Sequence, residues 1–197
     1  LLPVDQAKET SLAFIDKNSS EKKKLILTTK AQVIICDQEV KEYCKEMNLK
    51  FIMTDPNHKS GSDRIGEAVK KLEDIINFKF VINVQGDMPF INKHHINLLK
   101  KKLLQFQIAT LACPFISLDE AKNSSKVKVT IEDSNYALDF SRVLQSNLKI
   151  NENVFHHIGV YAYHKQFLLD FISLSPTQRE LDEKLEQLRI ININKIG

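Results

Sequence analysis

Short apolar runs alternate along the chain with stretches in which apolar residues recur every three or four positions. The first pattern is typical of buried strands and the second of amphipathic helices. Because regular alternation of the two builds strand–helix–strand crossover units, the first half predicts a mainly parallel sheet with helices on both faces. The predicted strands cover 33–36, 51–53, 80–84 and 108–112, and the predicted helices cover 38–47, 61–76 and 92–105.

After Ala112 the pattern changes to strands that are joined by short turns. The turn-forming residues 133–135 lie between two such runs and predict a hairpin. The fold class predicted is therefore α/β, Rossmann-like, with an inserted antiparallel element. The helical spacing of Leu181, Leu185 and Leu188 predicts that they form the core-facing stripe of a closing helix. The later strands are predicted over 127–131, 136–140 and 158–163, and the closing helices over 166–172 and 178–188.

Composition narrows the class of protein. The chain has 197 residues, 43% of them hydrophobic, which suits one domain with a sizeable core. Its 28 basic and 25 acidic side chains are too evenly balanced for a dedicated nucleic-acid surface. The three cysteines match no metal-site spacing and indicate reduced thiols in the cytoplasm. No apolar run approaches the roughly 20 residues that span a bilayer, and the five glycines form neither a dinucleotide-binding motif nor a P-loop.

A glycine turn that presents one carboxylate, Asp87, follows the predicted strand 80–84. Ligands of open α/β sheets bind beyond the carboxyl ends of the strands. A carboxylate in that place suits Mg²⁺, which prefers oxygen ligands and often bridges substrate phosphates. The alternative is an ordinary strand-terminating turn in which Asp87 caps the residues that follow.

The segment Ser60 to Arg64 opens the predicted helix 61–76. Ser60 with Asp63 fits a helix-capping box, which is sufficient reason for both residues. The functional alternative is that free backbone N–H groups and hydroxyls at this helix start face a nucleotide. Gly61 would then allow the backbone to approach the ligand closely.

Two later motifs carry polar candidates. Arg142 and His157 lie near predicted strand ends, where they could hold a carboxylate, since a guanidinium binds that group through two hydrogen bonds. They could equally be a surface charge and a strand residue with internal partners. Glu186 and Gln187, in the predicted closing helix, could reach sugar hydroxyls or lie in solvent.

From about Val33 to Arg189, these pieces occur in the order typical of CMP-Kdo synthetases, and the chain resembles that family. The resemblance implies a nucleotide-diphospho-sugar-transferase-like fold. It also implies transfer of CMP from CTP to 3-deoxy-D-manno-octulosonate (Kdo), giving CMP-Kdo and pyrophosphate for lipopolysaccharide biosynthesis. The matching pieces cover 53–64, 81–89, 109–112, 127–129, 136–138, 140–142, 157–161 and 185–189.

The resemblance also implies a role for each candidate residue, in an enzyme that works as a cytoplasmic homodimer. Asp87 would bind Mg²⁺ and serve catalysis. The nucleotide would contact Ser60, Gly61 and Gln85, and the sugar acid would contact Arg142, His157, Tyr161, Glu186 and Gln187. A related cytidylyltransferase acting on another sugar acid is the nearest alternative.

The chain departs from the family pattern in three places, one of them the stretch 143–147, where the family has prolines and a further arginine. The family's triphosphate loop has no counterpart before Val33, and its second metal-binding aspartate would fall after Gly197. A catalytically inactive nucleotide- or sugar-binding remnant is therefore an alternative. Residues 1–31 instead resemble the N-terminal uridine-binding domain of UDP-3-O-acylglucosamine N-acyltransferase. This predicts an atypical segment, 1–32, fused or misjoined to a cytidylyltransferase-like domain, 33–197, that is truncated at both ends relative to the family.

Overall fold

The structure is a computed structural model, and it describes most of the chain from Val33 onward together with one short strand before it. The candidates Gln85 and Asp87 and the predicted turn 133–135 lie outside the described residues. The described residues are 12–14, 33–36, 38–58, 60–75, 77–84, 88, 90–132, 136–145, 149–191, 193 and 196–197.

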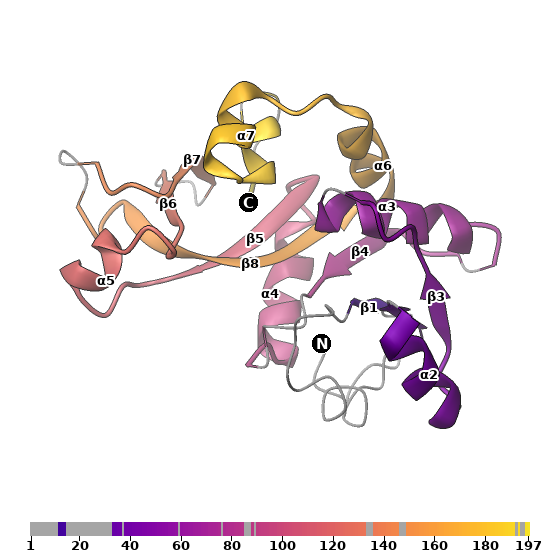
Figure 1. Ribbon diagram of the computed structural model, residues 1–197. Coiled ribbons are helices and arrows are strands. Elements are labelled where there is room, and N and C mark those ends of the chain that lie inside the picture. Colours follow the sequence, from indigo (N-terminus) through magenta and orange to yellow (C-terminus); the bar gives the residue numbers. More distant parts are fainter. Residues whose placement is uncertain are drawn as a thin grey trace.

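Three strands form a parallel sheet in the order β1-β2-β3 (Figure 1). These are β1 (Leu12–Phe14), β2 (Val33–Cys36) and β3 (Phe51–Met53). Helix α2 (Gln38–Glu46) connects β2 to β3, and α3 (Gly61–Leu72) follows β3. The predictions for β2, α2 and β3 are confirmed. Strand β1, which lies within the segment 1–32, was not predicted, and it pairs with β2.

A second, five-stranded sheet is built around the long strand β8 (Val154–His164). One edge of β8 pairs with β5 (Ile108–Cys113), while β4 (Phe80–Asn83) and β6 (Lys128–Ile131) also pair with it. Strand β7 (Ala137–Ser141) extends the sheet beyond β6. All these pairings are antiparallel. Strands β4 and β5 therefore run in the same direction, and β8 runs in the opposite direction between them.

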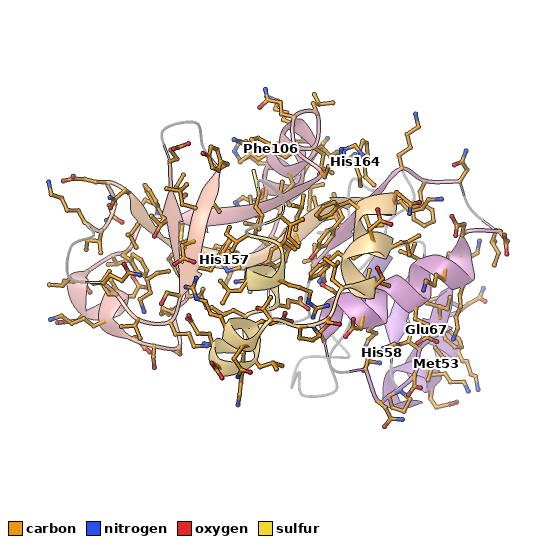
Figure 2. All side chains as sticks on the ribbon, turned by 90° about the horizontal axis from the view of Figure 1, so that it is seen from above. Met53, His58, Glu67, Phe106, His157 and His164 are labelled. Carbon is orange, nitrogen blue, oxygen red and sulfur yellow. The ribbon has the colours of Figure 1, made fainter. Side chains whose placement is uncertain are left out.

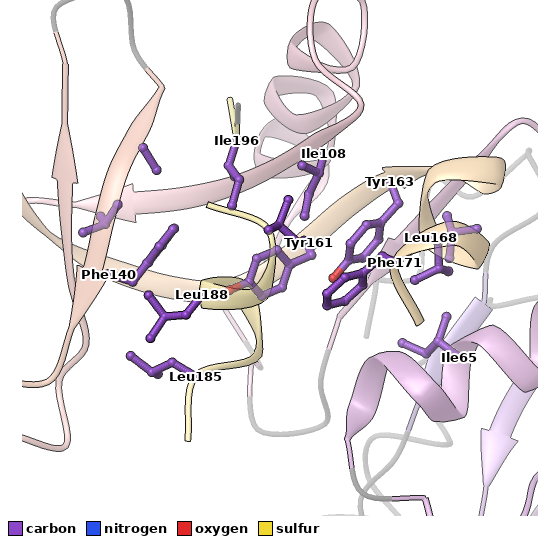
Figure 3. Packing of buried hydrophobic residues seen from close by; sticks show 14 of the residues in the cluster. Ile65, Ile108, Phe140, Tyr161, Tyr163, Leu168, Phe171, Leu185, Leu188 and Ile196 are labelled. Atoms are coloured by element: carbon purple, nitrogen blue, oxygen red, sulfur yellow. The ribbon is translucent and has the colours of Figure 1, made fainter. Parts of the chain in front are cut away.

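Helices cover both faces of this sheet, which confirms the α/β fold class (Figure 1). Helix α4 (Lys93–Lys102) packs Ile96 and Leu99 against Val160 and Ala162 of β8. On the opposite face, α3 and α6 (Lys165–Ser173) bury apolar residues against the alternate positions of β8, where Tyr161 lies (Figure 3). The short helix α5 (Leu118–Lys122) was not predicted. None of the helices in the described part of the chain is long and apolar enough to cross a bilayer.

The prediction of one closing helix over 178–188 is wrong. Helix α7 (Gln178–Glu183) ends at Lys184, whose φ of 53° is left-handed, and the 3-10 helix η1 (Glu186–Arg189) follows. The predicted stripe divides with it, because Leu181 is 57% exposed whereas Leu185 and Leu188 are buried. Breaking the helix turns η1 towards the sheet, where these two leucines join the core (Figure 3).

Candidate functional site

The start of α3 carries the first group of candidates. Ser60 is the N-cap residue, and its Oγ accepts a hydrogen bond from the backbone N–H of Asp63 over 3.1 Å. The capping role predicted for Ser60 is therefore confirmed. Gly61 is the first residue of the helix, and Ser62 is buried. N–H groups at a helix start suit an anion, and here the backbone N–H of Ser62 bonds the carboxylate of Glu186.

The carboxylate of Glu186 lies against this helix start, although 124 residues separate it from Ser62 in sequence. Ser62 Oγ donates a hydrogen bond to Glu186 Oε1 over 2.9 Å. Because that uses the only hydroxyl proton of Ser62, the hydroxyl of Tyr163, 3.3 Å from Ser62 Oγ, is the donor in the second contact. We call these residues the polar cluster (Ser60, Ser62, Tyr161, Tyr163 and Glu186). It joins α3, β8 and η1.

Burial sets the protonation of the polar cluster. Burial raises the pKa of Glu186 above its ordinary value, while hydrogen bonds from Ser60 and Ser62 offset part of the rise. Burial also raises the pKa of Tyr161 and of Tyr163, and the charge of Glu186 adds to both shifts. Both phenols therefore remain protonated hydrogen-bond donors at physiological pH.

Four buried side-chain atoms among the described residues have no hydrogen-bond partner, and they belong to three residues. They are both polar atoms of the Asn83 carboxamide, the hydroxyl of Tyr161 and Oε2 of Glu186. Asn83 ends β4 directly opposite Tyr161 of β8. Leaving such a group unpaired costs about 1–3 kcal/mol. Native proteins contain few such groups, so their concentration here marks the place as a candidate binding site.

His157 (Figure 2) lies on the same strand as Tyr161. The ring centroids of the two residues are 5.4 Å apart. The pairing of β5 with β8 shifts register between Thr110 and Leu111, and Thr110 Oγ1 donates to the carbonyl of Val160 there. His157 Nε2, 3.0 Å from Thr110 Oγ1, is therefore the donor in their contact. Burial lowers the pKa of His157 to about 3, and the charge of His156 adds to the shift. The imidazole is neutral at physiological pH.

The guanidinium of Arg142 faces backbone carbonyls. Its Nε donates to the carbonyl of Glu183 over 2.6 Å, and its terminal nitrogens donate to the carbonyls of Ser124 and Lys184. These bonds hold the end of α7, directly before the segment that carries Glu186. Arg142 thus supports the position of the polar cluster, and its guanidinium makes no hydrogen bond to another candidate among the described residues.

Three candidates remain: Gln187, which is buried, and Gln85 and Asp87, which lie outside the described residues. Gln187 is buried in η1 beside Glu186. Gln85 and Asp87 follow β4 in sequence, and their predicted roles stay predictions. Sequence reasoning missed Tyr163, Ser62 and Asn83. The signal available for Asn83 was a polar residue within an apolar strand pattern.

A set of contacts centred on Glu67, which we call the clamp, holds the loop that leads from β3 to the start of α3 (Figure 2). Glu67 Oε2 accepts hydrogen bonds from the backbone N–H of Asp55, over 2.8 Å, and from His58 Nε2, over 2.5 Å. Glu67 Oε1 also pairs with Lys71, and Arg64 donates to the carbonyl of Asp55. The clamp fixes the loop that delivers Ser60 to its capping position.

We expect Glu67→Gln to lower the melting temperature by about 3–6 °C at neutral pH, because charge-assisted hydrogen bonds are lost. Burial acts to raise the pKa of Glu67, but the bonds from Lys71, Asp55 and His58 hold it at about 2. This stabilisation is complete above about pH 4.5 and is lost as the pH falls towards 2.

Thermal melts of wild type and Glu67→Gln between pH 7 and pH 2 measure this difference. The melting temperatures of the two proteins should converge below pH 4.5. Glu73→Gln is the matched control, since Glu73 pairs with Lys165 and is 43% exposed, and such pairs contribute little. A difference that stays constant down to pH 2 would contradict the assigned role of the Glu67 carboxylate.

Comparison with known proteins places this geometry in a family. The family model described as Cytidylyltransferase matches residues 23–196. The 3-deoxy-manno-octulosonate cytidylyltransferase of Helicobacter acinonychis is 36% identical over 170 residues, covering 83% of this chain and 70% of the relative. The corresponding protein of Protochlamydia amoebophila is 33% identical over 163 residues, covering 79% of this chain and 63% of the relative. The chain thus spans about two-thirds of the length of these relatives.

Solved structures agree with the sequence comparison. A CMP:2-keto-3-deoxy-manno-octonic acid synthetase complexed with CTP superimposes with a TM-score of 0.77 at 26% identity, covering 95% of this chain and 88% of that one. The 4-diphosphocytidyl-2C-methyl-D-erythritol synthase of Anaerococcus prevotii shares the fold, with a TM-score of 0.55 at 12% identity over 95% of this chain and 86% of that one. The chain belongs to the cytidylyltransferase family.

Proposed function

We propose that this chain carries the sugar-acid site of a cytidylyltransferase that transfers CMP from CTP to Kdo. The observation that carries the proposal is the unpartnered, buried hydroxyl of Tyr161 together with the unpartnered Oε2 of Glu186, near the start of α3. The first is a donor and the second an acceptor, so a sugar hydroxyl can satisfy both. The names of the relatives, 3-deoxy-manno-octulosonate cytidylyltransferases, support Kdo as that sugar acid.

In the proposed reaction the anomeric hydroxyl of Kdo attacks the α-phosphorus of CTP. A bond forms between the sugar oxygen and that phosphorus, the bond to the β-phosphate bridging oxygen breaks, and pyrophosphate leaves. The hydroxyl proton passes to solvent. The work of the protein is then to position both substrates and neutralise charge. Glu186, Gln187, Tyr161 and His157 hold the sugar, and Arg142 secures the segment that bears Glu186.

The nucleotide side of the proposed site is the start of α3 with the segment that follows β4. Ser60, Gly61 and Gln85 would contact CTP, whose phosphates suit the N–H groups of a helix start. Asp87 would hold Mg²⁺, which neutralises phosphate charge when bound. A single carboxylate fits this ion, because Mg²⁺ usually takes one or two carboxylates together with substrate phosphates and water. Among the described residues, no group of three potential ligands forms an alternative cage.

The proposed enzyme works in the cytoplasm as a homodimer and supplies CMP-Kdo for lipopolysaccharide biosynthesis. The proposed second copy is supported by four exposed large apolar side chains, those of Ile116, Leu118, Leu138 and Val143. These residues lie on and beside α5 and β7, the part of the structure farthest from α3 in Figure 1. Association with a second copy would remove these apolar side chains from water.

Pyrophosphate release from CTP and Kdo in the presence of Mg²⁺ tests the proposal. We expect turnover by the wild type, and an about ten- to hundredfold loss of kcat/KM in Tyr161→Phe, because a buried partner for the substrate hydroxyl is lost. Calorimetry with CTP and with Kdo separates binding from turnover. The matched control is Tyr136→Phe, because Tyr136 lies directly before β7 and outside the polar cluster.

Each outcome of these measurements has a distinct meaning. Binding of both substrates without pyrophosphate release would support a catalytically inactive binding protein. Turnover with another sugar acid but not with Kdo would overturn the substrate assignment and leave the family reaction in place. Unchanged kcat/KM in Tyr161→Phe would overturn the sugar-binding role of the polar cluster.

A further inference from the structure

Asn83 lies on the sheet face that carries the polar cluster, yet neither its sequence motif nor the proposed function gives it a role. It is the last residue of β4 and stands opposite Tyr161 of β8. Side chains of directly opposed residues in an antiparallel pair lie on the same face, about 5 Å apart at Cβ. The carboxamide of Asn83 therefore lies beside the base of the Tyr161 side chain, just before the Gln85–Asp87 segment.

The surroundings of Asn83 are unusual for an asparagine. Its exposed fraction is 2%, and both its amide nitrogen and its amide oxygen lack hydrogen-bond partners. Asn151 provides the contrast, because its Oδ1 accepts from the N–H of Phe115 and its Nδ2 donates to the carbonyl of Phe115. An asparagine kept for structure is bonded in this manner. Asn83 instead lowers the stability of the folded protein, because its buried polar atoms lose their bonds to water without replacement.

The chemistry of the unpartnered atoms indicates which ligand they suit. Asn83 Nδ2 and the Tyr161 hydroxyl are donors, whereas Asn83 Oδ1 and Glu186 Oε2 are acceptors. A phosphate or carboxylate would satisfy the donors and leave the acceptors unpaired. Sugar hydroxyls both donate and accept, so they satisfy all four atoms. The set therefore matches a polyhydroxylated ligand better than a triphosphate.

We propose that Asn83 is a further substrate-contacting residue, whose carboxamide donates to and accepts from hydroxyl groups of the sugar acid. This inference rests on the proposed function and adds β4 to the elements that select the sugar. Asn83 and Glu186 then hold the sugar from β4 and from η1. The same atoms select the sugar acid over other ligands, because a ligand that lacks these hydroxyls leaves the buried polar groups unpaired.

Asn83→Leu tests the proposal, because leucine has nearly the same shape and no polar atoms. Removing unpartnered buried groups should raise the melting temperature of the ligand-free protein by about 2–4 °C. The same change should weaken Kdo binding about ten- to hundredfold in calorimetry and leave CTP binding within about twofold. A rise in stability together with a loss of sugar binding is the signature of a residue kept for function.

Two further variants make the test decisive. Asn83→Ala removes the same atoms without any risk of overpacking, and it should weaken Kdo binding to a similar extent. Asn151→Leu, the matched control, should lower the melting temperature and leave Kdo affinity unchanged. A leucine variant that melts lower or fails to fold, or alanine and leucine variants with wild-type Kdo affinity, would overturn the inference and leave the proposed function standing. Wild-type protein that binds CTP but no Kdo would overturn both.

Discussion

Arg189→Leu is expected to lower the free energy of unfolding by about 3–5 kcal/mol, as is typical when one partner of a buried ion pair is removed. Arg189 and Glu180 are each 6% exposed. The Nε and one terminal nitrogen of Arg189 donate to the two carboxylate oxygens of Glu180, over 2.9 Å and 2.5 Å. The substitution leaves the buried Glu180 carboxylate without its counter-charge, and that is the source of the expected loss.

Arg189 makes further contacts that leucine cannot replace. Its remaining terminal nitrogen donates to the carbonyl of Leu174 over 3.1 Å, and its guanidinium carbon lies 4.9 Å from the ring centroid of Phe171. Arg189 therefore ties η1 to α7 and to the end of α6. Because η1 also carries Glu186, the substitution should weaken Kdo binding as well as stability.

Urea denaturation of Arg189→Leu and Arg179→Leu measures the effect against a matched control. Arg179 also binds a carboxylate through two bonds, to Asp139, but its side chain is 46% exposed. Its loss should cost about 1 kcal/mol or less, since solvent screens an exposed pair. The double variant Glu180→Gln with Arg189→Leu should recover part of the stability, because no buried charge remains unpaired. Equal losses in the two arginine variants would contradict the assignment.

The sequence predicted the strands from β2 onward well, because burial dictates their composition, but it did not predict that β8 pairs with both β4 and β5. The apolar run 80–84 and the alternation along 158–163 each match an observed strand, with β8 beginning four residues earlier than predicted. Periodicity failed at the closing helix, where Leu181, Leu185 and Leu188 share a helical stripe. The break at Lys184 depends on tertiary packing of η1 against the sheet and on the Glu180–Arg189 pair, which no local pattern contains.

The candidate site was only partly accessible to sequence reasoning. Tyr161 was reached through resemblance, and Glu186 was already a candidate from its place in the predicted closing helix. The structure brings both to the polar cluster. The contact between Ser62 and Glu186 could not be predicted, because a separation of 124 residues leaves no local signal. Asn83 stayed hidden for a different reason: its significance lies in hydrogen bonds that it does not make. For Arg142, the chemistry of the guanidinium suggested a carboxylate as its partner, whereas its hydrogen bonds in the structure go to backbone carbonyls.

The second large effect is expected at Asp87. We predict that Asp87→Asn lowers kcat/KM for pyrophosphate release by about a thousandfold. A bound metal ion contributes several kcal/mol to stabilising charge in the transition state, and each 1.36 kcal/mol corresponds to about a tenfold change in rate. Asparagine keeps the shape of the side chain and removes its negative charge, so the loss reports on charge and not on packing.

The effect of Mg²⁺ on CTP binding shows whether Asp87 binds the metal ion or acts in another way. Calorimetry should show that Mg²⁺ tightens CTP binding in the wild type and has little effect on CTP binding in Asp87→Asn, while Kdo affinity stays unchanged. Asp170→Asn serves as the control, because Asp170 lies on α6 and its Oδ1 accepts a hydrogen bond only from Gln166 at the surface. If the Mg²⁺ dependence persists in Asp87→Asn, the ion is held by other groups, and the alternative holds in which Asp87 belongs to an ordinary strand-terminating turn and caps the residues that follow.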